Sequence, residues 1–252
     1  MPKLGWLVGV ALVFFAGAAG ADDWVRPEPT SYHSRGFAEV AEIFPPNSRQ
    51  NPGGKPLCFF YAIGYPGIAW QIDARLAWKG PLVNESMPYQ ALVSPEGDLV
   101  TLNEHGSVGY RNAVVLYGRN GTLVKAYALE DLIPASELES WEHDGKVSLS
   151  TSSRWWTREA KYYFLAEPRR VAIFLPWAYA LEIPLDGSPA AYGPVESFAA
   201  LAALRRKEAA AAATGHFGAI NEEVEVWATS LRFSSITDVL TARAGLRRRL
   251  PP

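Results

Sequence analysis

Two short runs of the sequence combine acidic residues with histidine: Glu104-His105 and, further along, Glu142-His143-Asp144. Carboxylate oxygens and imidazole nitrogens bind divalent metals, and the same groups exchange protons in general acid–base catalysis. If the loops that carry these runs meet at one edge of a sheet, they would form an acid–base pair, or a metal site with His105, His143 and Asp144 as ligands. The alternative is two solvated surface loops, which is the usual state of polar loops.

A second group of candidate residues is aromatic. The chain has nine tryptophans, and Trp155 and Trp156 are adjacent. Successive side chains of a strand point to opposite faces, so one of this pair is expected in the core and the other at the surface or against a neighbouring unit. With Glu104, Tyr110 and Arg154, such aromatic faces could bind a sugar or a peptide. The alternative, which we favour, is a second core layer under the C-terminal helices, because tryptophan is largely buried on average.

Signature motifs of common enzyme classes are missing from the sequence. It contains no G-x-S-x-G, H-E-x-x-H or C-x-x-C pattern, no phosphate-binding loop and no dinucleotide fingerprint. Its four histidines are scattered, and none stands at metal-ligand spacing from another. The single cysteine, Cys58, lies in an apolar run, which favours a small buried hydrophobe over a nucleophile or metal ligand. We therefore expect no cofactor.

The elements that must position these residues are clearest between Ala91 and Leu132. Ser94–Gly97 is a Ser-Pro-Glu-Gly turn. Asn120-Gly121 predicts a two-residue type I′ hairpin turn, which needs a positive φ at both residues. The predicted strands are 98–102, 113–117 and 123–129, the second of them uniformly apolar, as in a strand buried on both faces. The segment therefore predicts a three-stranded antiparallel meander.

A similar order of turns and strands recurs on either side of this segment. The three predicted units span about 34–80, 91–132 and 152–187. Three units of three strands are too few to close a propeller, which needs at least about four blades. The expected fold class is mainly β, with antiparallel meander units arranged as an incomplete propeller-like array or as a sandwich. We expect these units to form one domain over residues 22–194.

Part of the chain resembles known β-repeat proteins. SPEGDLVTL, at 94–102, resembles the start of a blade in WD40-like propeller repeats, where a Ser-Pro-Asp-Gly turn precedes the first strand. Together with NGTLVKAYALEDL at 120–132 and SSRWW at 152–156, it resembles an uncharacterised family of secreted bacterial proteins. The resemblance implies a β-meander architecture and secretion. It implies no activity, and so it assigns no functional residue.

Residues 1–21 have the organisation of a signal peptide. Lys3 gives a positive start, Leu4 to Phe15 form an apolar core, and Ala19-Gly20-Ala21 fits a cleavage site. The apolar core is short for a membrane span, and an uncleaved anchor is the alternative. We expect a secreted or periplasmic protein with no transmembrane segment after cleavage. The net charge of −2 gives no indication of a nucleic acid partner.

The composition changes near residue 195, and the segment 195–252 is rich in alanine, leucine and arginine. Phe198, Leu201 and Leu204 share one face of a predicted helix. A second helix is predicted from Asn221, although its apolar residues also alternate as in a strand. We expect this helical segment to pack on the β domain, because about fifty residues of short helices bury too little apolar surface to be stable alone.

Two hypotheses of function follow. The first is an exported, non-enzymatic β scaffold that binds a protein or a glycan. It rests on the export signal, the strand units, the aromatic residues and the missing enzyme motifs. The alternative is a periplasmic hydrolase that uses loop carboxylates and histidines, with or without a metal. We favour the first, and metal analysis of the purified protein would distinguish the two.

The cleavage site leads to a prediction about the mature protein. We predict that the exported chain begins at Asp22, because Ala19-Gly20-Ala21 has the small residues that signal peptidase requires. N-terminal sequencing of exported protein is expected to read Asp-Asp-Trp. An exported chain that retains Met1 would contradict the prediction and favour the uncleaved anchor.

Overall fold

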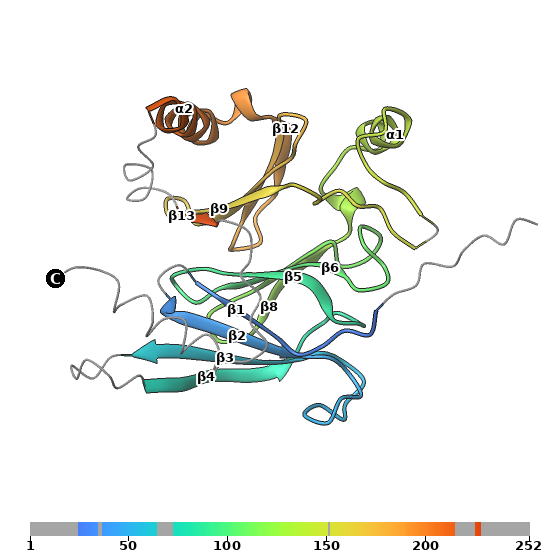
Figure 1. Cartoon of the computed structure of the whole chain (residues 1–252), viewed down its shortest axis with the longest axis vertical. Coiled ribbons are helices and arrows are strands. Elements are labelled where there is room, and N and C mark those ends of the chain that lie inside the picture. Colours follow the sequence, from blue (N-terminus) through green and yellow to red (C-terminus); the bar gives the residue numbers. More distant parts are fainter. Residues whose placement is uncertain (1–24, 35–36, 65–72, 151, 215–224, 228–252) are drawn as a thin grey trace, which may run out of the picture.

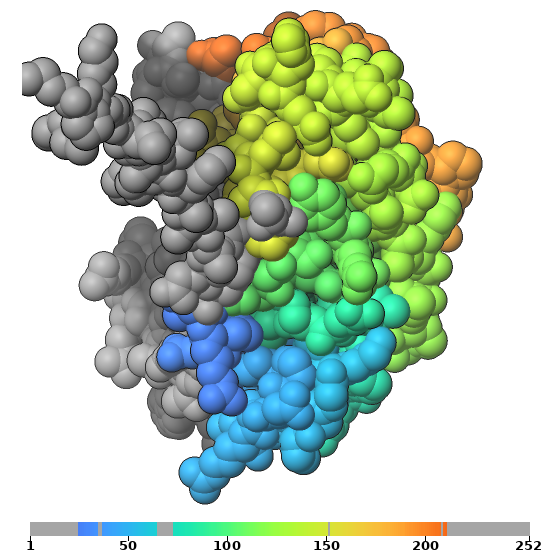
Figure 2. Space-filling view, turned by 90° about the vertical axis from the view of Figure 1, so that its right-hand side faces the viewer, coloured from blue at the N-terminus to red at the C-terminus, as the bar shows by residue number. Residues whose placement is uncertain are grey.

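The structure is a computed structural model that describes residues 25–34, 37–64, 73–150, 152–214 and 225–227. The expected signal peptide, 1–21, lies outside these residues. In the described part of the chain, the strands form three antiparallel sheets that follow one another along the sequence. Figure 1 shows the sheets as successive layers, with the first sheet at the bottom and helix α2 (Ala199–Thr214) at the top. The space-filling view in Figure 2 shows the same order on the surface, from blue to orange.

Each sheet is a meander of consecutive strands. The first sheet contains β1 (Thr30–His33), β2 (Glu39–Phe44), β3 (Leu57–Gly64) and β4 (Asp73–Pro81). The middle sheet contains β5 (Pro88–Val93), β6 (Leu99–Glu104), β7 (Val114–Tyr117) and β8 (Leu123–Tyr127). The third sheet contains β9 (Lys161–Leu165), β10 (Arg170–Phe174), β11 (Tyr179–Pro184) and β12 (Ala191–Pro194). A further strand, β13 (Glu225–Trp227), pairs antiparallel with β9.

The two central strands of the middle sheet, β6 and β7, are buried on both faces. Every residue of β6 and β7 is buried. On one face, Leu99 and Val115 share a core with Phe60 of the first sheet. On the other face, Val100 shares a second core with Val171 of the third sheet. The uniformly apolar run at 113–117 is therefore a strand between two cores, as its composition predicts.

Two helices pack their apolar side chains against the sheets. Helix α1 (Ala135–His143) places Leu138 and Trp141 in the core between the middle and third sheets. Helix α2 packs Leu201 and Leu204 against the outer face of the third sheet. Two short 3-10 turns, η2 (Leu129–Asp131) and η3 (Val195–Ser197), connect strands to these helices. None of the described helices is long and apolar enough to cross a bilayer.

The predicted fold class is confirmed: the protein is mainly β, its sheets are antiparallel meanders, and the described strands close no barrel. The predicted strand number per unit is wrong, because each unit has a fourth strand at the edge of its sheet, and β13 adds a fifth strand to the third sheet. The added strands are β1, β5 and β12. Strand β1 follows Pro29, β5 begins with Pro88, and β12 contains Gly193 and Pro194. Glycine and proline are unfavourable inside strands but are tolerated at edges. Edge strands that contain them therefore lack the apolar alternation by which a strand is recognised in a sequence.

Two local predictions also need correction. At the β7–β8 hairpin, only Gly121 of the Asn-Gly pair has a positive φ, +77°. The Gly121 N–H donates to the Gly118 carbonyl at 2.8 Å, and the β7–β8 register shifts beside the turn. This is a type I turn followed by a left-handed glycine and a bulge, in place of a type I′ turn. Near the C-terminus, Glu225–Trp227 adopts the strand alternative and not the predicted helix.

Gly121 also sits where two sheets meet. A Cβ added to Gly121 would lie 2.6 Å from the ring of Trp78 on β4, whereas one added to Gly106, at φ +84°, would contact nothing within 4 Å. We predict that Gly106→Ala lowers the free energy of unfolding by about 1 kcal/mol through backbone strain alone. Gly121→Ala is expected to cost about 3 kcal/mol, because the clash with Trp78 adds to the same strain. Urea denaturation of both variants measures the difference, and equal losses would contradict this packing.

Candidate functional site

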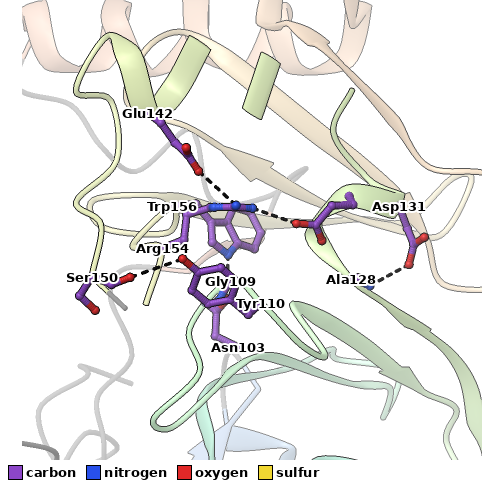
Figure 3. Close-up of polar contacts among 10 residues, drawn as sticks. Asn103, Gly109, Tyr110, Ala128, Asp131, Glu142, Ser150, Arg154 and Trp156 are labelled. Carbon is purple, nitrogen blue, oxygen red and sulfur yellow. Dashed lines mark hydrogen bonds and ion pairs between the residues drawn. The ribbon is translucent and has the colours of Figure 1, made fainter. Parts of the chain in front are cut away.

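Arg154, one of the predicted binding residues, connects several structural elements through its side chain. Its side chain is only 12% exposed, and its two terminal nitrogens pair with Glu130 at 2.9 Å and Glu142 at 3.1 Å (Figure 3). Its guanidinium also lies 5.0 Å from the centre of the Tyr110 ring. These contacts join η2, α1 and the β6–β7 loop. Because its terminal nitrogens are held by protein carboxylates, Arg154 is a structural residue and not an open ligand for an anion.

Trp156 belongs to a buried polar node at the end of β6. Its Nε1 donates to Asn103 Oδ1 at 2.7 Å, and the same oxygen accepts the Gly109 N–H at 3.1 Å. Asn103 Nδ2 donates to Thr157 Oγ1 at 3.0 Å. Asn103 has φ +58°, a left-handed conformation that asparagine tolerates better than most residues. Trp156 is fully buried whereas Trp155 is half-buried, so the adjacent pair divides between core and surface as expected.

Glu104 was predicted in a solvated loop, and the structure corrects this. It is the last residue of β6 and is 2% exposed. Its Oε1 accepts hydrogen bonds from the Glu85 N–H, at 3.0 Å, and from the Asn112 side-chain amide. Its carboxylate therefore stabilises the chain on either side of β6. His105 follows it and pairs through its backbone with Met87.

The run Glu142-His143-Asp144 was also predicted in a loop. Glu142 and His143 instead lie on α1, a helix that the sequence pattern does not indicate because Leu138 and Trp141 are its only buried residues. Asp144 accepts from Ser140 and pairs with Lys146, each at 2.9 Å. The hydrogen bond from Lys146, followed by that from Ser140, lowers the pKa of Asp144.

The structure does not join the two acidic runs into a metal site. The described contacts hold the two runs separately: Glu104 accepts from Glu85 and Asn112, and Asp144 from Ser140 and Lys146. Within the ranges that the structure describes, no cluster of three or more histidine, cysteine or acidic residues could hold a metal ion. Cys58 is fully buried on β3, and burial raises the pKa of its thiol. That environment fits the predicted small hydrophobe and disfavours a thiolate.

Trp155 lies in an open pocket of about 310 Å³ that the sequence does not predict. The lining residues are Tyr89, Gln90, Ser148, Trp155, Thr157 and Arg158. The rings of Trp155 and Tyr89 meet edge to face, with centroids 4.9 Å apart and planes at 77°. Edge strand β5 supplies Tyr89 and Gln90, and the connection between α1 and β9 supplies the rest. An aromatic pair therefore stands beside an amide, two hydroxyl groups and a guanidinium.

A second pocket, of about 380 Å³, is also lined by Tyr89. Its lining comprises residues 25–30 of the N-terminal segment together with Tyr32, Met87, Pro88, Tyr89 and His105. Tyr89 is common to both pockets. Trp155 and His105, two of the residues singled out from the sequence, thus line two pockets that share Tyr89.

Comparison with known proteins transfers no residue role to this surface. No protein-family model, no curated protein and no solved structure matches the chain. Tyr89 and Gln90 are not among the residues singled out from the sequence, because the sequence pattern does not indicate β5. The signal that could have found them is Met87-Pro88-Tyr89, where a proline and an aromatic residue precede the apolar run of the edge strand.

The polar node at Asn103 leads to a prediction about stability. Asn103→Gly keeps the left-handed backbone but removes the acceptor of the buried Trp156 and Gly109 N–H groups. We expect a loss of about 2–4 kcal/mol in the free energy of unfolding, because buried donors without partners are costly. Asn47→Gly is the matched control, since Asn47 has φ +54° and is exposed. A similar small loss in both variants, measured by chemical denaturation, would argue against the node.

Proposed function

We propose that the protein is an exported, non-enzymatic scaffold that binds a glycan in the Tyr89–Trp155 pocket. The observation that carries the proposal is the half-buried aromatic pair in an open pocket, flanked by Gln90, Ser148 and Thr157. A sugar ring has an apolar face of C–H groups and a rim of hydroxyls. The aromatic rings match the face, and amide and hydroxyl groups match the rim because each can both donate and accept.

A peptide ligand is the other reading of an aromatic pocket on an edge strand. An extended peptide adds to a sheet through backbone hydrogen bonds with an edge strand, and β5 is an edge strand of the middle sheet. Pro88 begins this strand and has no N–H, so the edge offers one donor fewer. Most of the described residues that line the pocket belong to the connection between α1 and β9, which carries Ser148 and Thr157. These features favour a glycan over strand addition.

The hydrolase alternative has less support. It requires loop carboxylates and histidines that converge, whereas Glu104 is buried among amide donors and Asp144 is paired with Lys146. The groups that do converge at Trp155 are aromatic, hydroxyl, amide and guanidinium groups. That set suits recognition by shape and hydrogen bonding.

The aromatic pair gives a direct test. The chain from Asp22 onward is first screened on a glycan array, and the affinity of the retained sugar is measured by calorimetry. Trp155→Ala is expected to weaken binding at least tenfold, about 1.4 kcal/mol, because it removes the apolar wall of the pocket. Phe59→Ala is the matched control, since Phe59 is also half-buried in an edge-to-face pair, with Phe44.

Two results would contradict the proposal. One is a bound glycan whose affinity is unchanged by Trp155→Ala or is equally weakened by Phe59→Ala. The other is retention of peptides, but of no glycan, by the same protein. The second result would instead support a peptide ligand at the edge of β5.

A further inference from the structure

The two pockets that share Tyr89 provide more room for a ligand than a site for a single sugar. They measure about 310 and 380 Å³, and each is within the range of pockets that hold small ligands. Because Tyr89 lines both, the two pockets adjoin at this residue, and a ligand long enough to pass Tyr89 would contact both. Two subsites that adjoin at one residue suit a chain of sugar units better than one ring.

The walls of the second subsite are made by the N-terminal segment. Residues 25–29 precede β1 and lie across from Met87 and His105. Pro27 and Pro29 restrict the backbone of this segment and keep it extended. Tyr32 contributes a further aromatic side chain. The second subsite thus has the same mixture of apolar walls and polar groups as the first.

The charges in the two subsites indicate the chemistry of the ligand. Arg158 lines the first subsite and Arg26 the second, and both are exposed. Neither arginine forms an ion pair with an acidic residue of the described part of the chain. Glu28 is the one acidic residue among the described lining of the two pockets. Each subsite therefore offers a guanidinium, which binds carboxylates well.

We propose that the ligand is a linear acidic oligosaccharide that lies across Tyr89, with a carboxylate near Arg158 and another near Arg26. This inference rests on the proposed glycan-binding function and specifies its ligand. The Trp155 pocket holds one sugar unit against the aromatic pair. Units further along the chain reach the subsite formed by the N-terminal segment.

The test uses oligogalacturonides of one to six units, with cello-oligosaccharides of the same lengths as neutral counterparts. The six-unit acidic ligand is expected to bind at least tenfold more tightly than both galacturonic acid and cellohexaose, because it alone fills both subsites with charge. Arg26→Gln is expected to weaken the six-unit ligand severalfold and to leave the one-unit ligand unchanged. Arg158→Gln is expected to weaken ligands of every length. Arg49→Gln, an exposed arginine outside both pockets, is the matched control.

The outcomes separate this inference from the function it rests on. Equal affinity for one and six units, equal affinity for the neutral series, or equal effects of Arg26→Gln and Arg49→Gln would each overturn the inference. If another glycan binds in a Trp155-dependent manner while galacturonides do not, the inference fails and the proposed function stands. If no glycan binds at all, both fail.

Discussion

Burial of the two central strands of the middle sheet on both faces is the constraint from which the rest of the structure follows. Strands β6 and β7 expose no residue, so each face needs a partner layer. The first sheet covers one face and the third sheet the other, each with its own apolar core. The third sheet then needs a cover of its own, which α2 provides. A stack built in this way grows by layers and requires no ring closure, which is how three units form a stable fold without a complete propeller.

This packing decides where chemistry can occur. A polar group inside a strand that is buried on both faces must bond within the protein, as Thr101 does to Asn84, and other polar groups lie at strand ends, edges and connections. At the end of β6, Asn103 and Glu104 use their polar atoms to hold neighbouring segments, and Arg154 does the same for η2 and α1. These side chains therefore bond to other residues of the protein and are not available to a ligand. Edge strand β5 is different, because Tyr89 and Gln90 face a pocket.

The sequence predicts the parts of the fold that have a strong apolar pattern. The run at 113–117 indicates a doubly buried strand, and β7 is one. Edge strands and α1 lack such a pattern, because burial on one side needs few apolar residues and α1 buries only Leu138 and Trp141. The candidate site depends on β5, so only one member of its aromatic pair could be predicted from the sequence. Trp155 is visible in the sequence, but its partner Tyr89 becomes apparent only when the strand is placed.

The adjacent tryptophans connect stability to the proposed binding. Trp156 is locked by its hydrogen bond to Asn103, and Arg154 is held by two carboxylates. Trp155 lies between them in the chain, so its backbone position is fixed from both sides, and its N–H is bonded to Ser148. A ligand that meets this ring therefore orders little of the protein when it binds. Because ordering flexible groups reduces affinity, a pre-positioned ring lets a small contact area support useful binding. The same polar node that stabilises the connection between sheets thus prepares the surface that we propose for the glycan.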